Sequence, residues 1–243
     1  MDKKTDRIKI FPDRFLTGEK DESNPYLTAA LYFLVGLMSL MLILVVFVSM
    51  CRVDGESMLD THKDGDHVLL YKFADEFSYG DVIVFDVELG GKTDRLIKRV
   101  IGLPGDELLF VREADADTVV LYRKAAGTET FALLGNADAD SAGKNYEAYI
   151  KEPMKASKFD KDFAAKYLAP DATDASMEKY RYLVDEGCLF VMGDNRNDST
   201  DSRVFGQIPE SVVVGKEIFH FTQGSLLEKI MLVIFNSGHR EVQ

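Results

Sequence analysis

Two short segments of this sequence contain the residue types needed for nucleophilic catalysis. Ser57 lies in the run 54–58 (DGESM), and Lys98 lies in the run 95–101 (RLIKRVI). A serine hydroxyl needs a neighbouring base to become a nucleophile, and histidine is the usual base. The sequence around Ser57 lacks the second glycine of a nucleophile elbow, and none of the four histidines has a companion pattern. A Ser-His-Asp triad therefore has little support.

A lysine is the other candidate for the base. If 95–101 is a strand, Lys98 and Arg99 point to opposite faces, so one of them lies among apolar neighbours. An arginine keeps its proton in proteins, whereas a desolvated lysine can lose it near pH 7. Such a lysine could accept the proton of Ser57. On the pattern alone, however, an ordinary exposed strand lysine is the commoner case, and both interpretations stay open.

The overall composition excludes several classes of protein. The 243 residues include 29 Lys and Arg against 41 Asp and Glu, a net charge of −12. Nucleic-acid binding needs a basic face, so no nucleic acid is expected as a partner. The two cysteines cannot form a disulfide framework, there is no C-x-x-C pair, and the histidines are scattered. We expect no histidine-rich metal site.

The elements that must position these residues begin with one long apolar segment. Residues 26–51 (YLTAALYFLVGLMSLMLILVVFVSMC) carry no charge, and as a helix they would be ~39 Å long against a hydrocarbon core of ~30 Å. A buried core helix rarely runs so far without a polar face. A cleaved signal peptide has a shorter apolar region, and Met50 before Cys51 is a poor fit to a lipoprotein site. The segment predicts an uncleaved transmembrane helix.

The flanking charges predict the orientation of this helix. Six Lys and Arg precede it, and over a similar length only three follow it: Arg52, Lys63 and Lys72. The positive-inside rule then makes residues 1–25 a cytoplasmic segment and residues 52–243 an extracytoplasmic domain of a single-pass cell-membrane protein. Residues 1–23 carry six charges of each sign and Arg52 adds one positive charge, so residues 53–243 carry a net −13. The lipid bilayer holds this domain through the helix rather than through charge.

The outer domain reads as mainly β, with a folded-over antiparallel sheet. Short apolar or alternating runs, several of them preceded by Gly-Asp turns, predict strands at 66–71, 81–86, 95–101, 107–112, 118–123, 188–192 and 212–221. The stretch at about 124–187 lacks alternation and predicts an insertion. Two parts of it, 153–169 and 173–183, have helical character, and a short apolar helix is expected at 225–236.

Four segments in this order resemble the conserved boxes of bacterial type I signal peptidases. They are Ser57-Met58, 79–85 (YGDVIVF), 95–106 (RLIKRVIGLPGD) and 193–203 (GDNRNDSTDSR). The preceding apolar segment matches as well, and a single anchor resembles the arrangement common in Gram-positive members. The middle and last boxes are long and specific.

The resemblance implies a role for each matching residue. Ser57 would be the nucleophile and Lys98 the general base. Ser199 would hydrogen-bond and orient the lysine, Asp201 and Arg203 would form a structural ion pair near the site, and Met58 would help to shape the substrate pocket. The oxyanion would be met by the backbone N–H of Ser57. Some members add a hydroxyl two residues before the nucleophile, but Gly55 stands there and supplies none.

The resemblance covers the apolar segment and roughly residues 52–112 and 186–222, but no box covers the expected insertion. One departure lies next to the nucleophile, where Asp60 replaces the family's proline. The turn loses a fixed φ and gains a carboxylate, which puts the shape of the pocket and the efficiency of the enzyme in doubt. In the last box, Asn197 and Asp198 stand in the reverse of the more usual order.

The resemblance therefore implies a membrane-anchored serine endopeptidase, a hydrolase with a Ser-Lys dyad and no cofactor. It would remove signal peptides from exported preproteins that carry small residues at the first and third positions before the cut, and we expect a monomer. Two alternatives stay open. A self-cleaving Ser-Lys repressor-type protease would be soluble and carry a DNA-binding element. A non-catalytic membrane-tethered binding protein would retain the fold but not cut, and the departure at Asp60 is the one feature that favours it.

Overall fold

The computed structural model describes residues 24–59, 61–113, 118–134, 154–155, 166, 177–235 and 241–242. Two units, residues 1–44 and 45–243, are described separately. The first contains most of helix α2 (Pro25–Phe47), the one helix of the described residues that is long and apolar enough to cross a membrane. Asn24 caps this helix, because its Oδ1 accepts a hydrogen bond from the Tyr26 N–H at 3.0 Å.

The helix is shorter than the uncharged run from which it was predicted. It ends at Phe47, and strand β1 (Val48–Val53) follows at once. β1 pairs antiparallel with β2 (His67–Tyr71), and the side chains of Met50 and Cys51 are buried. Pairing and burial in the sheet therefore decide the conformation of the last four residues of the run, which hydrophobicity alone cannot separate from the helix.

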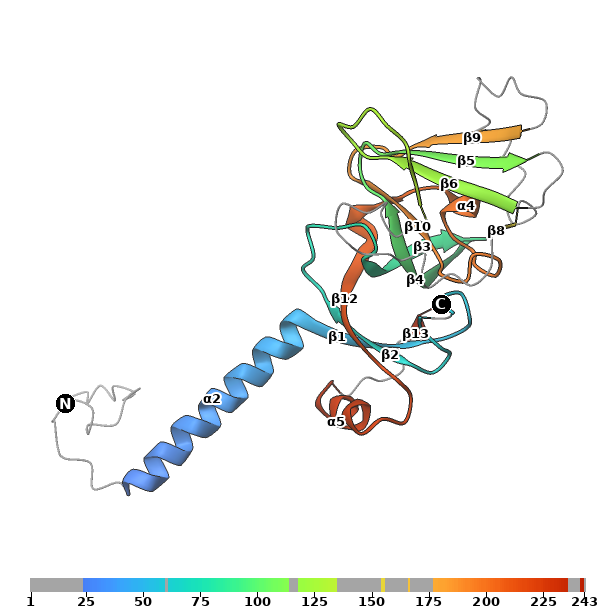
Figure 1. Ribbon diagram of the computed structural model, residues 1–243. Coiled ribbons are helices and arrows are strands. Elements are labelled where there is room, and N and C mark those ends of the chain that lie inside the picture. Colours follow the sequence, from blue (N-terminus) through green and yellow to red (C-terminus); the bar gives the residue numbers. More distant parts are fainter. Residues whose placement is uncertain are drawn as a thin grey trace, which may run out of the picture. The chain divides into compact units, whose positions relative to one another are not determined.

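The second unit is built mainly from two sheets (Figure 1). Within the described residues, the larger sheet has the strand order β11-β10-β4-β3-β12-β2-β1-β13, and all its pairs are antiparallel except β1–β13. Its further strands are β3 (Val82–Leu89), β4 (Lys92–Gly102), β10 (Cys188–Met192), β11 (Ile208–Pro209), β12 (Val213–Phe221) and β13 (Glu241–Val242). Three short elements connect or follow these strands. α4 (Ser202–Phe205) follows β10, the 3-10 turn η3 (Glu210–Val212) follows β11, and α5 (Leu226–Phe235) follows β12.

The predicted mainly β fold is confirmed, and each of the seven predicted strands is present. The smaller sheet has the order β7-β6-β5-β9, with β8 also pairing with β6. Its strands are β5 (Glu107–Glu113), β6 (Thr118–Lys124), β7 (Ala132–Leu133), β8 (Met154–Lys155) and β9 (Met177–Leu183). The short apolar helix expected at 225–236 is α5.

The expectation of helical structure in the second part of the insertion is wrong where the structure describes it. Instead of a helix at 173–183, β9 runs antiparallel to β5, and Tyr180 and Tyr182 point into the core. The alternation of these tyrosines is a strand signal, and pairing with β5 outweighs the local helical character. Most of 153–169 lies outside the described residues; of those described, 154–155 form the strand β8 and Lys166 is helical.

The core of the second unit lies on both faces of the larger sheet. β3 shows this directly, because Val82 and Val84 pack in one apolar cluster while Ile83 and Phe85 pack in another. A third cluster joins the smaller sheet to β4 and β10, and Tyr182 and Phe190 meet edge to face in it. Because both its faces are covered, the middle of β4 is almost completely buried.

Candidate active site

Ser57 lies on the loop that connects β1 to β2. Gly55 starts the loop in a left-handed conformation with φ of +92°, which a side chain would strain, and its N–H donates to Asp64 Oδ1 at 3.0 Å. The chain then makes a tight turn, in which the Leu59 N–H donates to the Glu56 carbonyl at 3.1 Å. Ser57 is half-buried at the head of this turn, so its hydroxyl is held against the sheet and still reachable from solvent.

Lys98 comes from the buried middle of β4 and meets Ser57. Its Nζ donates to Ser57 Oγ and to the Ile97 carbonyl, each at 2.8 Å. The side chain is only 1% exposed, and this burial lowers the pKa of Lys98 to about 8, against the opposing charges of Asp201 and Asp194. The amine is therefore much easier to deprotonate than an ordinary lysine.

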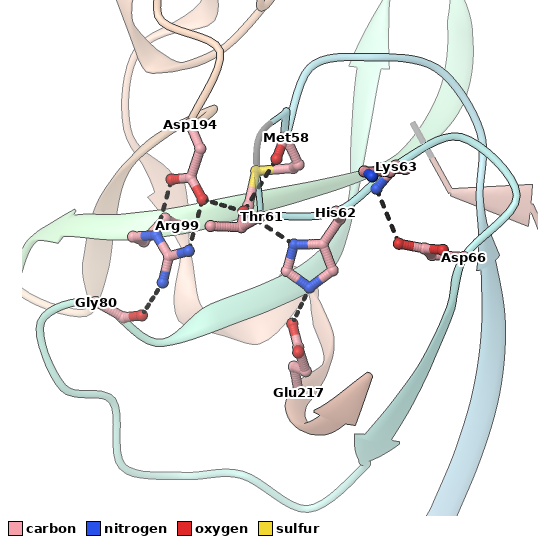
Figure 2. Close-up of polar contacts among 9 residues, drawn as sticks. All are labelled: Met58, Thr61, His62, Lys63, Asp66, Gly80, Arg99, Asp194 and Glu217. Atoms are coloured by element: carbon pink, nitrogen blue, oxygen red, sulfur yellow. Dashed lines mark hydrogen bonds and ion pairs between the residues drawn. The ribbon is translucent and has the colours of Figure 1, made fainter. Parts of the chain in front are cut away.

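Arg99 is buried beside Lys98, so the expected choice between the two is wrong: both lie inside, because β4 is covered on both faces. Arg99 forms an ion pair with Asp194. Its Nε donates to Asp194 Oδ1 at 2.8 Å, its Nη2 donates to Asp194 Oδ2 and its Nη1 donates to the Gly80 carbonyl (Figure 2). Burial alone would raise the pKa of Asp194, but the hydrogen bonds and charge of Arg99 outweigh burial and lower it. A bidentate ion pair thus compensates the second buried cation of β4.

Asp201 and Arg203 form a second buried bidentate pair, as the resemblance implied. Arg203 Nε and Nη2 donate to the two carboxylate oxygens of Asp201 at 2.8 and 2.7 Å, and neither side chain is exposed. Burial would raise the pKa of Asp201, but the charge of Arg203 and the hydrogen bonds from Arg203 and Gly193 lower it. Asp201 also accepts from the Gly193 N–H at 3.0 Å, so the pair holds the loop that follows β10.

That loop packs directly on the turn that carries Ser57. The Asn195 N–H donates to the Ser57 carbonyl, and Asn195 Nδ2 donates to the Glu56 carbonyl, both at 3.1 Å. Gly193 is needed here for space, because a Cβ on it would clash with the Ser57 carbonyl and with the side chain of Ser199. The segments 54–58 and 193–203 therefore meet through hydrogen bonds to the backbone of the turn, and the side chains of Lys98 and Arg99 join segment 95–101 to them.

Ser199 reaches this place but forms no hydrogen bond with Lys98. Its Oγ is buried and has no hydrogen-bond partner within the described part of the chain, so the implied bond to the lysine is not formed in this structure. Met58 is buried in the apolar cluster beside β1 and β2, and a pocket-shaping role stays a prediction. Asp60 lies outside the described residues.

Four polar residues near the site were not assigned a role from the sequence: Thr61, His62, Asp194 and Asn195. Thr61 Oγ1 donates to Asp194 Oδ2, and His62 Nδ1 lies 3.1 Å from the same hydroxyl. Asn195 braces the backbone on both sides of the peptide that joins Glu56 and Ser57. Asp194 and Asn195 belong to a Gly-Asp-Asn run, which by itself indicates only a turn. The turn could therefore be predicted from the sequence. The contacts of Asp194 and Asn195 could not, because their partners are distant in the sequence.

The arrangement has the parts of a serine nucleophile with an amine base. A primary hydroxyl lies within hydrogen-bond distance of an amine whose pKa is lowered to about 8, and the ion pairs Arg99–Asp194 and Arg203–Asp201 lie around it. Such a pair can perform acyl transfer at a carbonyl by side-chain chemistry alone.

Comparison with known proteins gives one consistent result. The family described as signal peptidase, peptidase S26, matches residues 26–222. The signal peptidase I of Bacillus caldolyticus is 28% identical over 171 residues, which cover 70% of this chain and 76% of that protein. The signal peptidase IB of Staphylococcus aureus strain Mu50 is 32% identical over 173 residues, 70% of this chain and 75% of that protein.

A crystal structure of a signal peptidase I from Enterococcus faecalis V583 is also similar in sequence. It is 27% identical and covers 58% of this chain and 97% of that one, with a TM-score of 0.29.

Proposed function

The chain belongs to the signal peptidase family, peptidase S26, and we propose that it is a membrane-anchored serine endopeptidase that removes signal peptides from exported preproteins. In this proposal Ser57 is the nucleophile and Lys98 the general base. The observation that carries it is the 2.8 Å hydrogen bond between Lys98 Nζ and Ser57 Oγ. The nucleophile and base lie in one site although they are distant in the sequence.

The lowered pKa of Lys98 supports its role as base. With a pKa of about 8, roughly one lysine in ten is neutral at pH 7, whereas at the ordinary value of 10.5 about one in three thousand would be. Burial thus raises the population of the active form by a factor of about 300. The two aspartates around Lys98 are each paired with an arginine, which limits how far they favour the ammonium form.

The proposed reaction has two halves. Neutral Lys98 takes the proton of Ser57 as the oxygen attacks the scissile carbonyl, and the Ser57 N–H stabilises the oxyanion. The lysine then gives this proton to the leaving amine, so the mature protein departs and the signal peptide stays esterified to Ser57. A water molecule, deprotonated by Lys98, attacks the ester; the released serine recovers a proton and the signal peptide leaves as a carboxylic acid.

Anchoring by α2 would place this chemistry at the membrane surface. The N-terminus would be cytoplasmic and the second unit extracytoplasmic, and Ser57 follows the last residue of the helix by only ten positions. The apolar part of a signal peptide occupies the same bilayer, so its cleavage site emerges near the anchor. Substrates would have small residues at the first and third positions before the cut, and the enzyme would act as a monomer.

The test is cleavage of a preprotein with an Ala-x-Ala site by the detergent-solubilised full chain. Ser57→Ala and Lys98→Arg should each abolish processing, because the first removes the nucleophile and the second puts a group that keeps its proton in place of the base. Matched controls are Ser78→Ala, at an exposed serine, and Lys216→Arg, at a half-buried strand lysine. Both should cleave at the wild-type rate.

Thermal unfolding separates loss of chemistry from loss of fold. Ser57→Ala should unfold at the wild-type temperature, and Lys98→Arg should remain folded at the assay temperature although its larger, permanently charged side chain lowers its unfolding temperature. Substantial cleavage by Lys98→Arg would refute the lysine-base mechanism. No cleavage by a well-folded wild-type protein would favour the non-catalytic binding protein instead.

A further inference from the structure

A second cluster of reactive side chains lies beside the nucleophile turn. His62 follows that turn, and Glu217 and His220 come from β12. His62 Nε2 lies 2.8 Å from Glu217 Oε2, the rings of His62 and His220 have centroids 5.2 Å apart, and one ligand atom from each residue lies within 4.8 Å of the other two. His62 is 3% exposed while His220 faces solvent, so the cluster is closed on one side and open on the other.

An irregularity in β12 brings Glu217 and His220 to the same face. Residues three apart in a regular strand point to opposite sides of the sheet. Here Glu217 pairs with Leu70 and His220 pairs with Val68, two positions that share a face of β2, and the register shifts between Glu217 and Phe219. Ile218 is the extra residue of this bulge. Bulges often re-aim side chains at functional sites, and this one places a carboxylate and an imidazole together.

The hydrogen bonds around Thr61 fix which nitrogen of His62 carries a proton. The single hydroxyl proton of Thr61 has the Asp194 carboxylate as its closest acceptor, and that carboxylate is ionised because Arg99 lowers its pKa. Thr61 Oγ1 must then accept from His62 Nδ1–H, 3.1 Å away (Figure 2). In the neutral ring this leaves a lone pair on Nε2, facing a carboxylate oxygen at 2.8 Å. At that distance a proton lies between the two atoms, and a metal ion can take its place once they move slightly apart.

We propose that His62, Glu217 and His220 bind a divalent transition-metal ion of the Zn²⁺ class. Two imidazoles and one carboxylate suit zinc, whereas Mg²⁺ and Ca²⁺ prefer oxygen ligands. Tetrahedral coordination requires ligand atoms about 3.3 Å apart, so the 2.8 Å contact between His62 and Glu217 must lengthen slightly and the His220 ligand atom, now within 4.8 Å of the other two, must approach them. Exposed His220 can close this gap by turning its side chain, and water completes the shell.

The ion would act as a structural tie at the active site. It would link the end of the nucleophile turn to β12, and the Met58 carbonyl already accepts hydrogen bonds from the backbone of Thr61 and His62. The Thr61 hydroxyl behind His62 would fix the orientation of the ring, as the second hydrogen bond of a metal-bound histidine commonly does. Through Thr61 and Asp194 the same chain of contacts reaches Arg99, next to the proposed base.

Metal binding can be measured without reference to activity. The full chain in detergent, stripped with EDTA and desalted, is titrated with ZnCl₂ by calorimetry and equilibrium dialysis. One ion per chain is expected, and at a free concentration 100 times the Kd the melting temperature should rise by about 5–10 °C. His220→Gln and Glu217→Gln should each weaken binding by at least about 100-fold. Thr61→Val should weaken it by about 10–100-fold, through the ring of His62.

The chain offers a matched control in His67, whose Nδ1 lies 2.7 Å from Glu228 Oε1. His67→Gln removes a histidine–carboxylate pair outside the cluster and should leave zinc binding unchanged, and MgCl₂ should produce no shift in wild type. Because His220 is exposed, its replacement should not disturb folding. Zinc binding that survives His220→Gln, or wild-type binding weaker than about 1 mM, would overturn the proposal and leave a proton between His62 and Glu217.

Discussion

The pH dependence of cleavage tests the most distinctive property of the site, a buried lysine that must be neutral to act. The ammonium form is inactive in the proposed mechanism, so kcat/KM should be lost as the pH falls through the pKa of Lys98. Burial lowers that pKa to about 8, which sets the position of the acid limb in the free enzyme.

The expected profile follows from the neutral fraction at each pH. For a pKa of about 8, kcat/KM should rise about ninefold from pH 6 to 7, about fivefold from pH 7 to 8 and about twofold from pH 8 to 9. An ordinary lysine would give about a tenfold rise from pH 8 to 9. A histidine base with a pKa of about 6.5 would give only about a 1.3-fold rise from pH 7 to 8. The interval from pH 7 to 9 therefore distinguishes all three.

The assay is steady-state cleavage of a fluorogenic peptide with an Ala-x-Ala site, between pH 6 and 9.5, by the detergent-solubilised protein. A variant with all four histidines replaced by glutamine is the control, and its acid limb should keep the same midpoint. A limb that vanishes in the histidine-free protein, or a midpoint near 6.5, would refute the reasoning. So would a rate that still rises tenfold above pH 8, because Lys98 would then be unperturbed.

Two further predictions concern the cost of burying Lys98 and the close approach of the Ser57 carbonyl to Gly193. Lys98→Met should be inactive but more stable at pH 7 by about 3 kcal/mol, the free-energy equivalent of a fall in pKa from 10.5 to about 8. Because the depressed pKa makes wild-type stability rise between pH 8 and 10.5, this gain should shrink over that range, and urea unfolding at pH 7 and pH 10 checks it. Gly193→Ala should lower kcat by at least about tenfold and stability by about 1–3 kcal/mol, since the new methyl group would push the Ser57 carbonyl away. Wild-type kcat in a stably folded Gly193→Ala protein would contradict the described contact.

The strands that carry the site could be predicted because their residues alternate or are uniformly apolar. The choice between Lys98 and Arg99 could not be predicted from that pattern, because it assumed that one face of β4 is open. Both side chains are buried, and what distinguishes them is the partner of each: Asp194 neutralises Arg99, while Lys98 contacts a hydroxyl. A single sequence does not reveal which distant carboxylate meets which cation.

The cluster on β12 was beyond sequence analysis for a different reason. Glu217 and His220 are an odd number of residues apart, so a regular strand would separate them, and the bulge at Ile218 is visible only in the pairing with β2. The expectation that scattered histidines exclude a metal site assumed that separation in the sequence implies separation in space.

The short strand β13 has a consequence for how the molecule avoids association. Glu241 and Val242 lie along the outer side of β1, and the Val242 carbonyl accepts a hydrogen bond from the Asp54 N–H at 2.7 Å, three residues before Ser57. Without them, β1 would become an unprotected edge, a template on which another chain could add a strand. Proteolytic removal of Glu241 and Val242 would therefore loosen the segment that leads to Ser57. It would also expose the unpaired edge of β1, so loss of activity and aggregation would begin together.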